Sequence, residues 1–283
     1  MRYLIKRNLL LFFRDKAAVF FYLLGVLLII GLYILFLGEV MKDSVDGTEG
    51  VAYLMDTWLM AGIIAVTPIT TSLGALGSMV EDQKLKIYKD FFASPIKRSG
   101  LAGGYIISSF IISLIMTLIA LILGELYIVI NGGDLLSWTG LVQVLGIIIF
   151  YNFTSIFIIY FLVSFFRSSN AFSAAATIVG TLIGFLTGIY IPIGNLPDAV
   201  QVVVKLIPPS HAAMLLRQIM TGEAEQKVFE GASATVIEDF QIAMGTIFQM
   251  GDLTVQWWHS LLYLLVIGIL FFALSLWKMS LKK

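Results

Sequence analysis

The sequence predicts an all-α integral membrane protein with six transmembrane helices, because of its composition and the lengths of its apolar runs. Hydrophobic residues make up 59% of the 283 residues, charged residues only 13%, and the mean hydropathy is +0.96. This composition is typical of polytopic membrane proteins, since a water-soluble fold could not bury so much apolar surface. The chain has no cysteine, which excludes disulfides, thiolate metal sites and cysteine nucleophiles.

Six apolar stretches each have about the 20 residues that a helix needs to cross a bilayer. The third is the longest and has room to tilt or to project from the membrane. The stretches lie near residues 18–37, 58–80, 101–130, 141–166, 171–191 and 257–277. Because they fill most of the chain, we expect one transmembrane domain over residues 1–283.

The basic residues concentrate on one side of the predicted membrane. If the spans alternate, then residues 1–17, residues 81–99, Arg167 and the C-terminal end share a side, which holds fourteen of the 18 lysines and arginines. Loops rich in Lys and Arg remain in the cytoplasm. We therefore expect both termini to be cytoplasmic and residues 195–256 to form an extracellular segment.

Residues 1–17 predict a short amphipathic helix that lies along the membrane surface. Apolar side chains such as Tyr3 and Leu10 are interspersed there with basic ones such as Arg7 and Arg14. A helix of this kind rests on anionic lipid headgroups. An anchor that fixes the topology and a contact for a partner protein are both compatible with the pattern.

The most informative polar stretch is residues 81–99, between the second and third apolar runs. Its apolar side chains recur at helical spacing, and Ser94-Pro95 ends the pattern. The candidate residues are Glu81, Asp82, Lys84, Leu85, Tyr88, Lys89, Phe91, Phe92 and Pro95. An interfacial helix on lipid and a coupling helix seated in a partner would both look this way. Phe91 and Phe92 favour the partner, because large rings commonly anchor such contacts.

Three glycines recur every fourth residue in the fifth apolar run. Gly180, Gly184 and Gly188 would form one smooth stripe on a helix. Small-residue stripes let a second helix approach closely in lipid, so helix packing is favoured over contact with a substrate.

Prolines interrupt the apolar sequence that follows this run. Pro192, Pro197, Pro208 and Pro209 each lack an N–H and restrict the residue before them, so one straight helix cannot continue. The run between them, Ala199–Ile207, is about half the length of a span. We expect it to lie at the interface or to dip into the membrane and return, as a re-entrant segment.

Glu125 is the only acidic residue well inside an apolar run. An intramembrane carboxylate is a functional candidate by default. Its place toward the end of the third run also fits a wet interfacial carboxylate. The two histidines, His211 and His259, lack metal-ligand spacing, so no metal site is expected.

The order of these features resembles the permeases of the ABC-2 family of ATP-binding-cassette transporters. In those permeases a fifth span ends in a proline-bearing turn, and a re-entrant helix, a proline pair and a Leu-Arg follow. Here these places hold Leu196-Pro197, Pro208-Pro209 and Leu216-Arg217. Their cytoplasmic loop begins with paired acids, as in Glu81-Asp82. Lys86 stands where that loop usually has a glycine.

The resemblance implies the membrane subunit of an ABC exporter that binds no cofactor itself. ATP and Mg²⁺ would bind to a separate ATPase, present in two copies, and residues 81–99 would be the coupling loop. Six spans make half a transporter, so a second permease, identical or similar, would complete a dimer. The implied cargo is amphiphilic or lipophilic, such as a drug, a lipid or a lipid-like natural product. The implied location is the lipid bilayer of a bacterial plasma membrane, with no nucleic acid as partner.

The residues agree with an outside source of energy. No Gly-Lys dipeptide occurs, so there is no Walker A loop. A membrane-embedded enzyme would ordinarily show clustered acids, histidines or a serine elbow within the spans, where only Glu125 is available. An ion-coupled secondary transporter would usually need ionisable groups at depth and two broken spans, whereas only the fifth is visibly broken. These two classes remain the alternatives.

Overall fold

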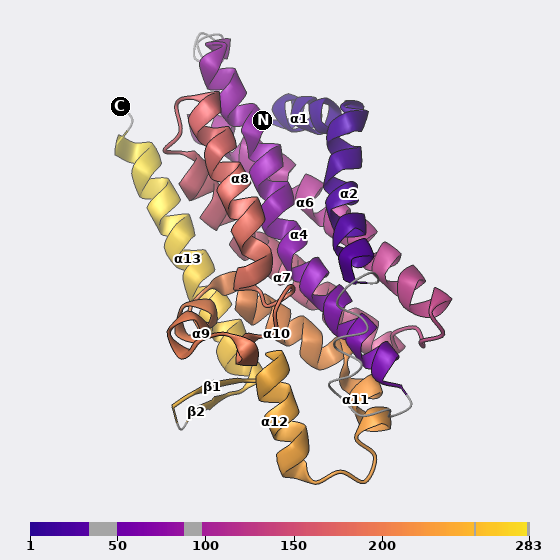
Figure 1. Ribbon diagram of the computed structural model, residues 1–283. Helices are drawn as coiled ribbons and strands as arrows, with labels where there is room; N and C mark the ends of the chain where they lie inside the picture. Colours follow the sequence, from indigo (N-terminus) through magenta and orange to yellow (C-terminus); the bar gives the residue numbers. More distant parts are fainter. Residues whose placement is uncertain (34–49, 88–97, 252, 282–283) are drawn as a thin grey trace.

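The protein is an elongated bundle of helices (Figure 1). The computed structural model describes residues 1–33, 50–87, 98–251 and 253–281. Both termini lie at one end of the bundle, which we call the terminal end. Residues 187–256 gather at the other end, which we call the distal end.

Within the described part of the chain, five helices are long and apolar enough to cross a membrane. They are α4 (Val51–Lys84), α6 (Arg98–Ile130), α7 (Trp138–Val163), α8 (Ser169–Leu186) and α13 (Trp257–Leu281). The all-α, polytopic fold is thereby confirmed. Helix α2 (Lys16–Leu32) reaches the edge of the described residues, so the count of six spans stays a prediction.

Helix α1 (Arg2–Arg14) lies across the terminal end, at an angle to the spans (Figure 1). It packs against α6, where Leu4 covers Gly104 so closely that a Cβ on that glycine would lie 2.5 Å from the leucine Cδ2. The short amphipathic helix expected at residues 1–17 is therefore present, and it packs on the bundle.

Helix α4 is the centre of the bundle. It packs against α6, α7 and α8, and its apolar stretch is almost wholly buried, unlike that of the other spans. Three hydroxyl and amide side chains meet beside Pro68, near the middle of three spans. Ser113 on α6 donates to Asn152 Oδ1 on α7 at 2.6 Å, and Thr71 on α4 donates to Ser113 at 3.1 Å. Interhelical hydrogen bonds of this kind hold membrane helices in register.

The end of α4 corrects one expectation. We placed Glu81, Asp82 and Lys84 in a loop, but they form the last turn of the helix. Glu, Gln and Lys are good helix formers, so nothing in this stretch stops the helix. The break comes at Lys86, whose φ of 61° is left-handed.

The end of α8 corrects another expectation. Helix α8 stops at Leu186, and Gly188 has a φ of 71°. The Ile189 N–H donates to the Gly184 carbonyl at 2.9 Å, which is the bond of a Schellman motif. Gly188 therefore ends the helix rather than continuing a stripe. Gly184 packs under the ring of Tyr190 of the same chain, and Gly180 faces open space.

The prolines begin elements at the distal end, as their fixed φ favours. Pro192 precedes a short 3-10 helix, η2 (Ile193–Asn195), and Pro197 precedes α9. Pro208 and Pro209 open α10, which meets α9 at 86°. The elements that follow η2 are α9 (Asp198–Lys205), α10 (Pro208–Met220), α11 (Gly222–Val228) and α12 (Ala234–Met244).

A β-hairpin closes the distal segment, where only helices were expected. Strand β1 (Phe248–Met250) pairs antiparallel with β2 (Leu253–Val255), and Gln249 lies opposite Thr254. Gly251, with a φ of 60°, lies in the turn. Two three-residue strands are too short to give an alternating pattern that the sequence could reveal.

Candidate functional site

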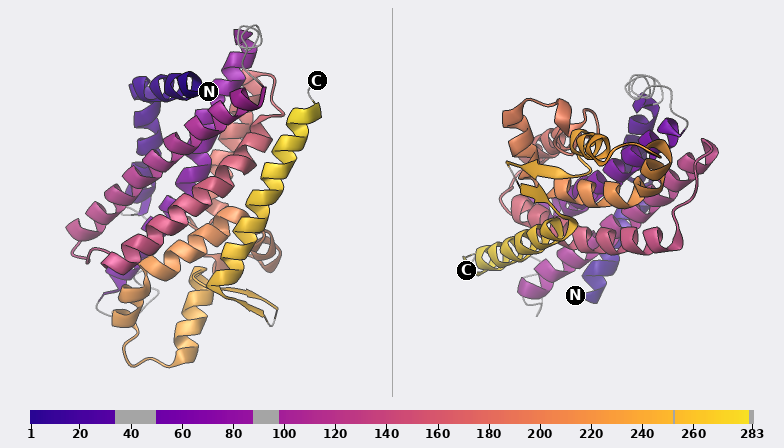
Figure 2. Two further views of the ribbon diagram at one scale, coloured as in Figure 1. Left: turned by 180° about the vertical axis from the view of Figure 1, so that it is seen from behind. Right: turned by 90° about the horizontal axis from the view of Figure 1, so that it is seen from below.

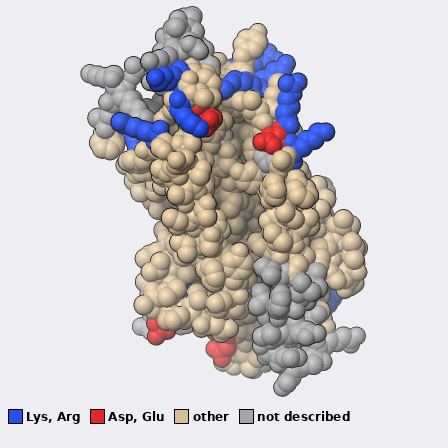
Figure 3. Space-filling view, turned by 45° about the horizontal axis from the view of Figure 1, so that its top comes forward, with Lys and Arg blue, Asp and Glu red and all other residues tan. Residues whose placement is uncertain are grey.

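The terminal end of the bundle carries most of the basic side chains on the face shown in Figure 3. The lysines and arginines of α1 and of the end of α4 lie there, above a wide belt of uncharged surface (Figure 3). Such a belt is what a bilayer requires. The sequence-predicted coupling residues begin at this end, which makes it the candidate site.

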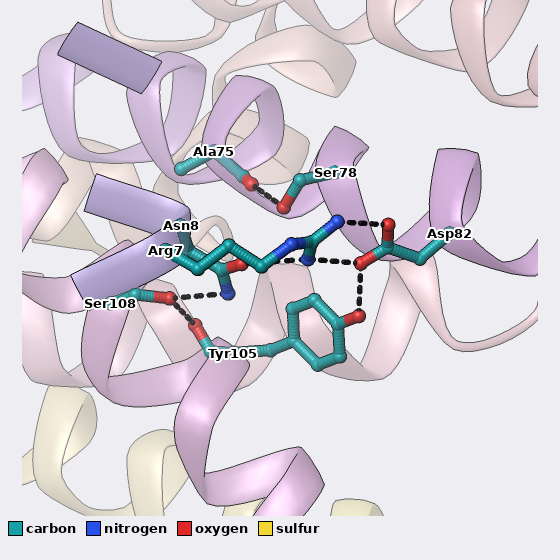
Figure 4. Close-up of polar contacts among 7 residues, drawn as sticks. All are labelled: Arg7, Asn8, Ala75, Ser78, Asp82, Tyr105 and Ser108. Carbon is teal, nitrogen blue, oxygen red and sulfur yellow. Dashed lines mark hydrogen bonds and ion pairs between the residues drawn. The ribbon is translucent and has the colours of Figure 1, made fainter. Parts of the chain in front are cut away.

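An ion pair joins α1 to α4 at the terminal end (Figure 4). Both terminal nitrogens of Arg7 donate to the Asp82 carboxylate, each at 2.6 Å. The Asp82 side chain is 5% exposed and that of Arg7 is 32% exposed. The hydrogen bonds that Arg7 donates to Asp82 raise the pKa of the guanidinium above its ordinary value, so Arg7 stays charged. Bidentate geometry of this type is both strong and directional.

Side chains of α6 complete this junction (Figure 4). The Tyr105 hydroxyl also donates to Asp82. Next to Arg7, Asn8 Nδ2 donates to Ser108 Oγ at 3.0 Å. We call these five residues, Arg7, Asn8, Asp82, Tyr105 and Ser108, the Arg7 junction. It links α1, α4 and α6 at the terminal end.

The neighbouring acid, Glu81, extends the contacts to α8. Ser169, at the start of α8, donates to Glu81 Oε2 at 2.9 Å. Lys84 lies 3.4 Å from the other oxygen of Glu81, and both side chains are about half exposed. Of the paired acids predicted to start the coupling loop, Asp82 therefore ties α1 and α6 to α4, and Glu81 ties α8 to α4.

The rest of the predicted coupling stretch is only partly described. Leu85 follows α4 and is 58% exposed, which leaves a large apolar side chain uncovered at the terminal end. Tyr88, Lys89, Phe91, Phe92 and Pro95 lie outside the described residues.

Lys86 occupies the position at which the family resemblance expects glycine. Its φ of 61° is the backbone conformation in which glycine is free of strain and other residues pay about 1 kcal/mol or more. A glycine at this position would avoid the backbone strain that Lys86 bears.

Arg217 forms a second junction, at the distal end. Its side chain, on α10, is fully buried and lies 4.2 Å from the centre of the Trp58 ring of α4. Its Nη2 donates to the Gly188 carbonyl at 3.3 Å, while Nε and Nη1 have no partner among the described residues. The Trp58 indole donates to the Met244 carbonyl at 2.8 Å. Arg217 thus packs α10, α4 and the break after α8 together.

Glu125 lies within α6, five residues before that helix ends at Ile130. Its Oε2 accepts from the Leu136 backbone N–H at 3.0 Å, and Oε1 is buried without a partner among the described residues. The carboxylate therefore holds the turn that leads into α7. Pro192, Pro197, Pro208 and Pro209 serve as helix starts.

Sequence reasoning missed most partners in these junctions. It read Arg7 as part of a lipid anchor and did not single out Tyr105, Thr71 or Ser113. Hydroxyl and amide groups inside apolar runs are the available signal, because a polar group in hydrocarbon needs a partner. That signal shows which residues need a hydrogen-bond partner, but it does not show which residue the partner is.

The fold and its junctions define a polytopic helical membrane protein whose polar side chains hold the helices together at both ends and at mid-depth. The chain belongs to the ABC-2 family transporter proteins, whose family model matches residues 46–277. The sequence resemblance to ABC-2 permeases is therefore confirmed. Such permeases are membrane transport components that generally work with ABC ATPases. A search of curated proteins found no match.

Breaking the Arg7 junction should destabilise the protein measurably. We expect Arg7→Met to lower the free energy of unfolding in detergent by about 2 kcal/mol, because the buried Asp82 loses its charged partner. Combined with Asp82→Asn, the loss should be smaller than the sum of the two. The control is Lys84→Met, which removes an exposed pair and should cost less than about 1 kcal/mol. Equal losses for both pairs would contradict the role of the junction.

Proposed function

We propose that this chain is the membrane subunit of an ABC exporter, which a separate ATPase drives. The main observation in support is the Arg7 junction, which joins α1, α4 and α6 at the start of the predicted coupling loop. A force that the ATPase applies to that loop would act on all three helices at once. The proposed cargo is amphiphilic or lipophilic, as the resemblance to ABC-2 permeases implies.

The proposed coupling contact is the pair Phe91 and Phe92. Changing both to alanine should weaken ATPase binding by about 2 kcal/mol, or roughly 30-fold, because buried aromatic anchors dominate such interfaces. The measurement is co-purification of the ATPase, with stimulated ATP hydrolysis as a second readout. The control is Phe20→Ala with Phe21→Ala, which removes two rings from the exposed surface of α2. Full retention of the ATPase by the Phe91 and Phe92 double variant would contradict the coupling proposal.

The proposed orientation places both termini in the cytoplasm of a bacterial cell. Its support is the concentration of Lys and Arg at the terminal end (Figure 3). Because the chain has no cysteine, single cysteines report the side directly. We expect Glu230→Cys to react with an impermeant maleimide on intact cells and Arg167→Cys to react only after lysis. The reverse pattern would show that the orientation is wrong.

We also propose that a second permease packs on α8. Helix α8 is the least buried of the five candidate spans, with Ile178, Leu182 and Phe185 exposed in a row of helical spacing. Ala174 lies one turn before Ile178 on the same face and is exposed. An apolar face with a small residue is suited to a close helix contact in lipid. Two copies would then recruit two ATPases.

Crosslinking tests this contact. Ile178→Cys should form a disulfide-linked dimer in native membranes, and adding Ala174→Leu should reduce the yield at least severalfold because the leucine holds the helices apart. Ala174 is exposed within its own chain, so the monomer should fold as before. The control is Ile122→Cys, equally exposed but on α6. Equal dimer yields at positions 178 and 122 would exclude α8 as the specific interface.

A further inference from the structure

An apolar groove runs between α7, α10 and α13, on a side of the bundle away from α8. Figure 2 shows α13 beside α7 here, and α10 packs against both. The groove has a volume of about 800 Å³, within the range of ligand-binding pockets. Its walls include Gly146 and Phe150 of α7, Leu215 and Ile219 of α10, and Leu261 of α13.

The groove is open at the surface of the bundle. Leu262 and Leu265 line it and are still 53% and 43% exposed. Along α13 it extends from Trp257 to Leu265, which is roughly 12 Å at the rise of an α-helix. Half of the hydrocarbon core of a bilayer is about 15 Å thick. The groove is therefore close to one leaflet in length.

A polar cavity adjoins the groove at its distal end. It has a volume of about 250 Å³ and shares Gln218 and Trp257 with the groove. Glu225, Gln241 and Thr246 are among its walls. The two hollows together are apolar along one leaflet and polar where that leaflet ends, as a lipid molecule is.

The polar cavity is acidic in character. The two oxygens of Glu225 accept from Thr221 at 2.6 Å and from Gln241 at 2.7 Å, which fixes the carboxylate in place. Thr246 Oγ1 is buried without a hydrogen-bond partner among the described residues. No lysine or arginine is among the described residues that line the cavity. A headgroup with a positive charge and N–H donors complements such a cavity better than an anionic one.

We propose that the groove and the polar cavity form one binding site for an amine-bearing phospholipid of the surrounding bilayer. One acyl chain lies in the groove, and the ethanolamine headgroup reaches the polar cavity, with its ammonium toward Glu225. A lipid is favoured over a helix of another protein because the groove spans a single leaflet, whereas a partner helix would cross both. The site goes beyond the proposed export function, since it needs neither an ATPase nor transport.

Lipid binding to the purified protein tests the proposal. Native mass spectrometry after titration with phosphatidylethanolamine should show one tight lipid per chain, and phosphatidylglycerol should bind roughly fivefold more weakly. Gly146→Phe should weaken binding roughly tenfold, the equivalent of excluding two methylene groups. Gly146 has open space at its Cβ, so the ring enters the groove without disturbing the helix. The control is Gly25→Phe, on α2, where the Cβ space is equally open.

A second variant tests the headgroup. Glu225→Gln keeps an acceptor for Gln241 and should abolish the preference for ethanolamine while the acyl chain still binds. Three outcomes would overturn the proposal: unchanged binding in Gly146→Phe, equal losses in Gly146→Phe and Gly25→Phe, or no headgroup preference in the unmodified protein. A protein dimer that Gly146→Phe dissociates would show instead that a second copy occupies the groove.

Discussion

The enclosure of α4 is the constraint on which the rest of the structure depends. A helix surrounded by other helices in a membrane has no water to satisfy its polar groups, so each of them needs a partner within the bundle. Trp58, Thr71 and Asp82 find theirs at the distal end, at mid-depth and at the terminal end. These three levels fix the depth at which the neighbouring helices can lie.

The spans themselves could be predicted from the sequence because a bilayer imposes a length on every apolar run. The helix ends could not be predicted as well. Glu81 and Asp82 looked like loop residues because they are charged, yet charge does not stop a helix that continues beyond the membrane. Gly188 looked like the last member of a stripe because spacing alone does not distinguish a packing glycine from one with a positive φ.

The pairing of residues within each junction was the least predictable feature of the structure. Arg7 and Asp82 are separated by 75 positions, and Thr71, Ser113 and Asn152 lie on three different spans. A sequence records that each of these groups is costly to leave alone in an apolar setting, and only the packing of the helices decides which of them meet. The prolines were more informative, because their effect on the backbone is local and needs no partner.

The length of α4 has a mechanical consequence. Its 34 residues form a rod of about 50 Å, well beyond the roughly 30 Å of hydrocarbon that it crosses. Asp82 and Trp58 hold α4 to its neighbours near its two ends. A displacement of the helix at one of these ends would therefore also move the other end. Pro68 lies between them and lacks the N–H that would stiffen the helix there, so part of such a displacement could be lost to bending at that position.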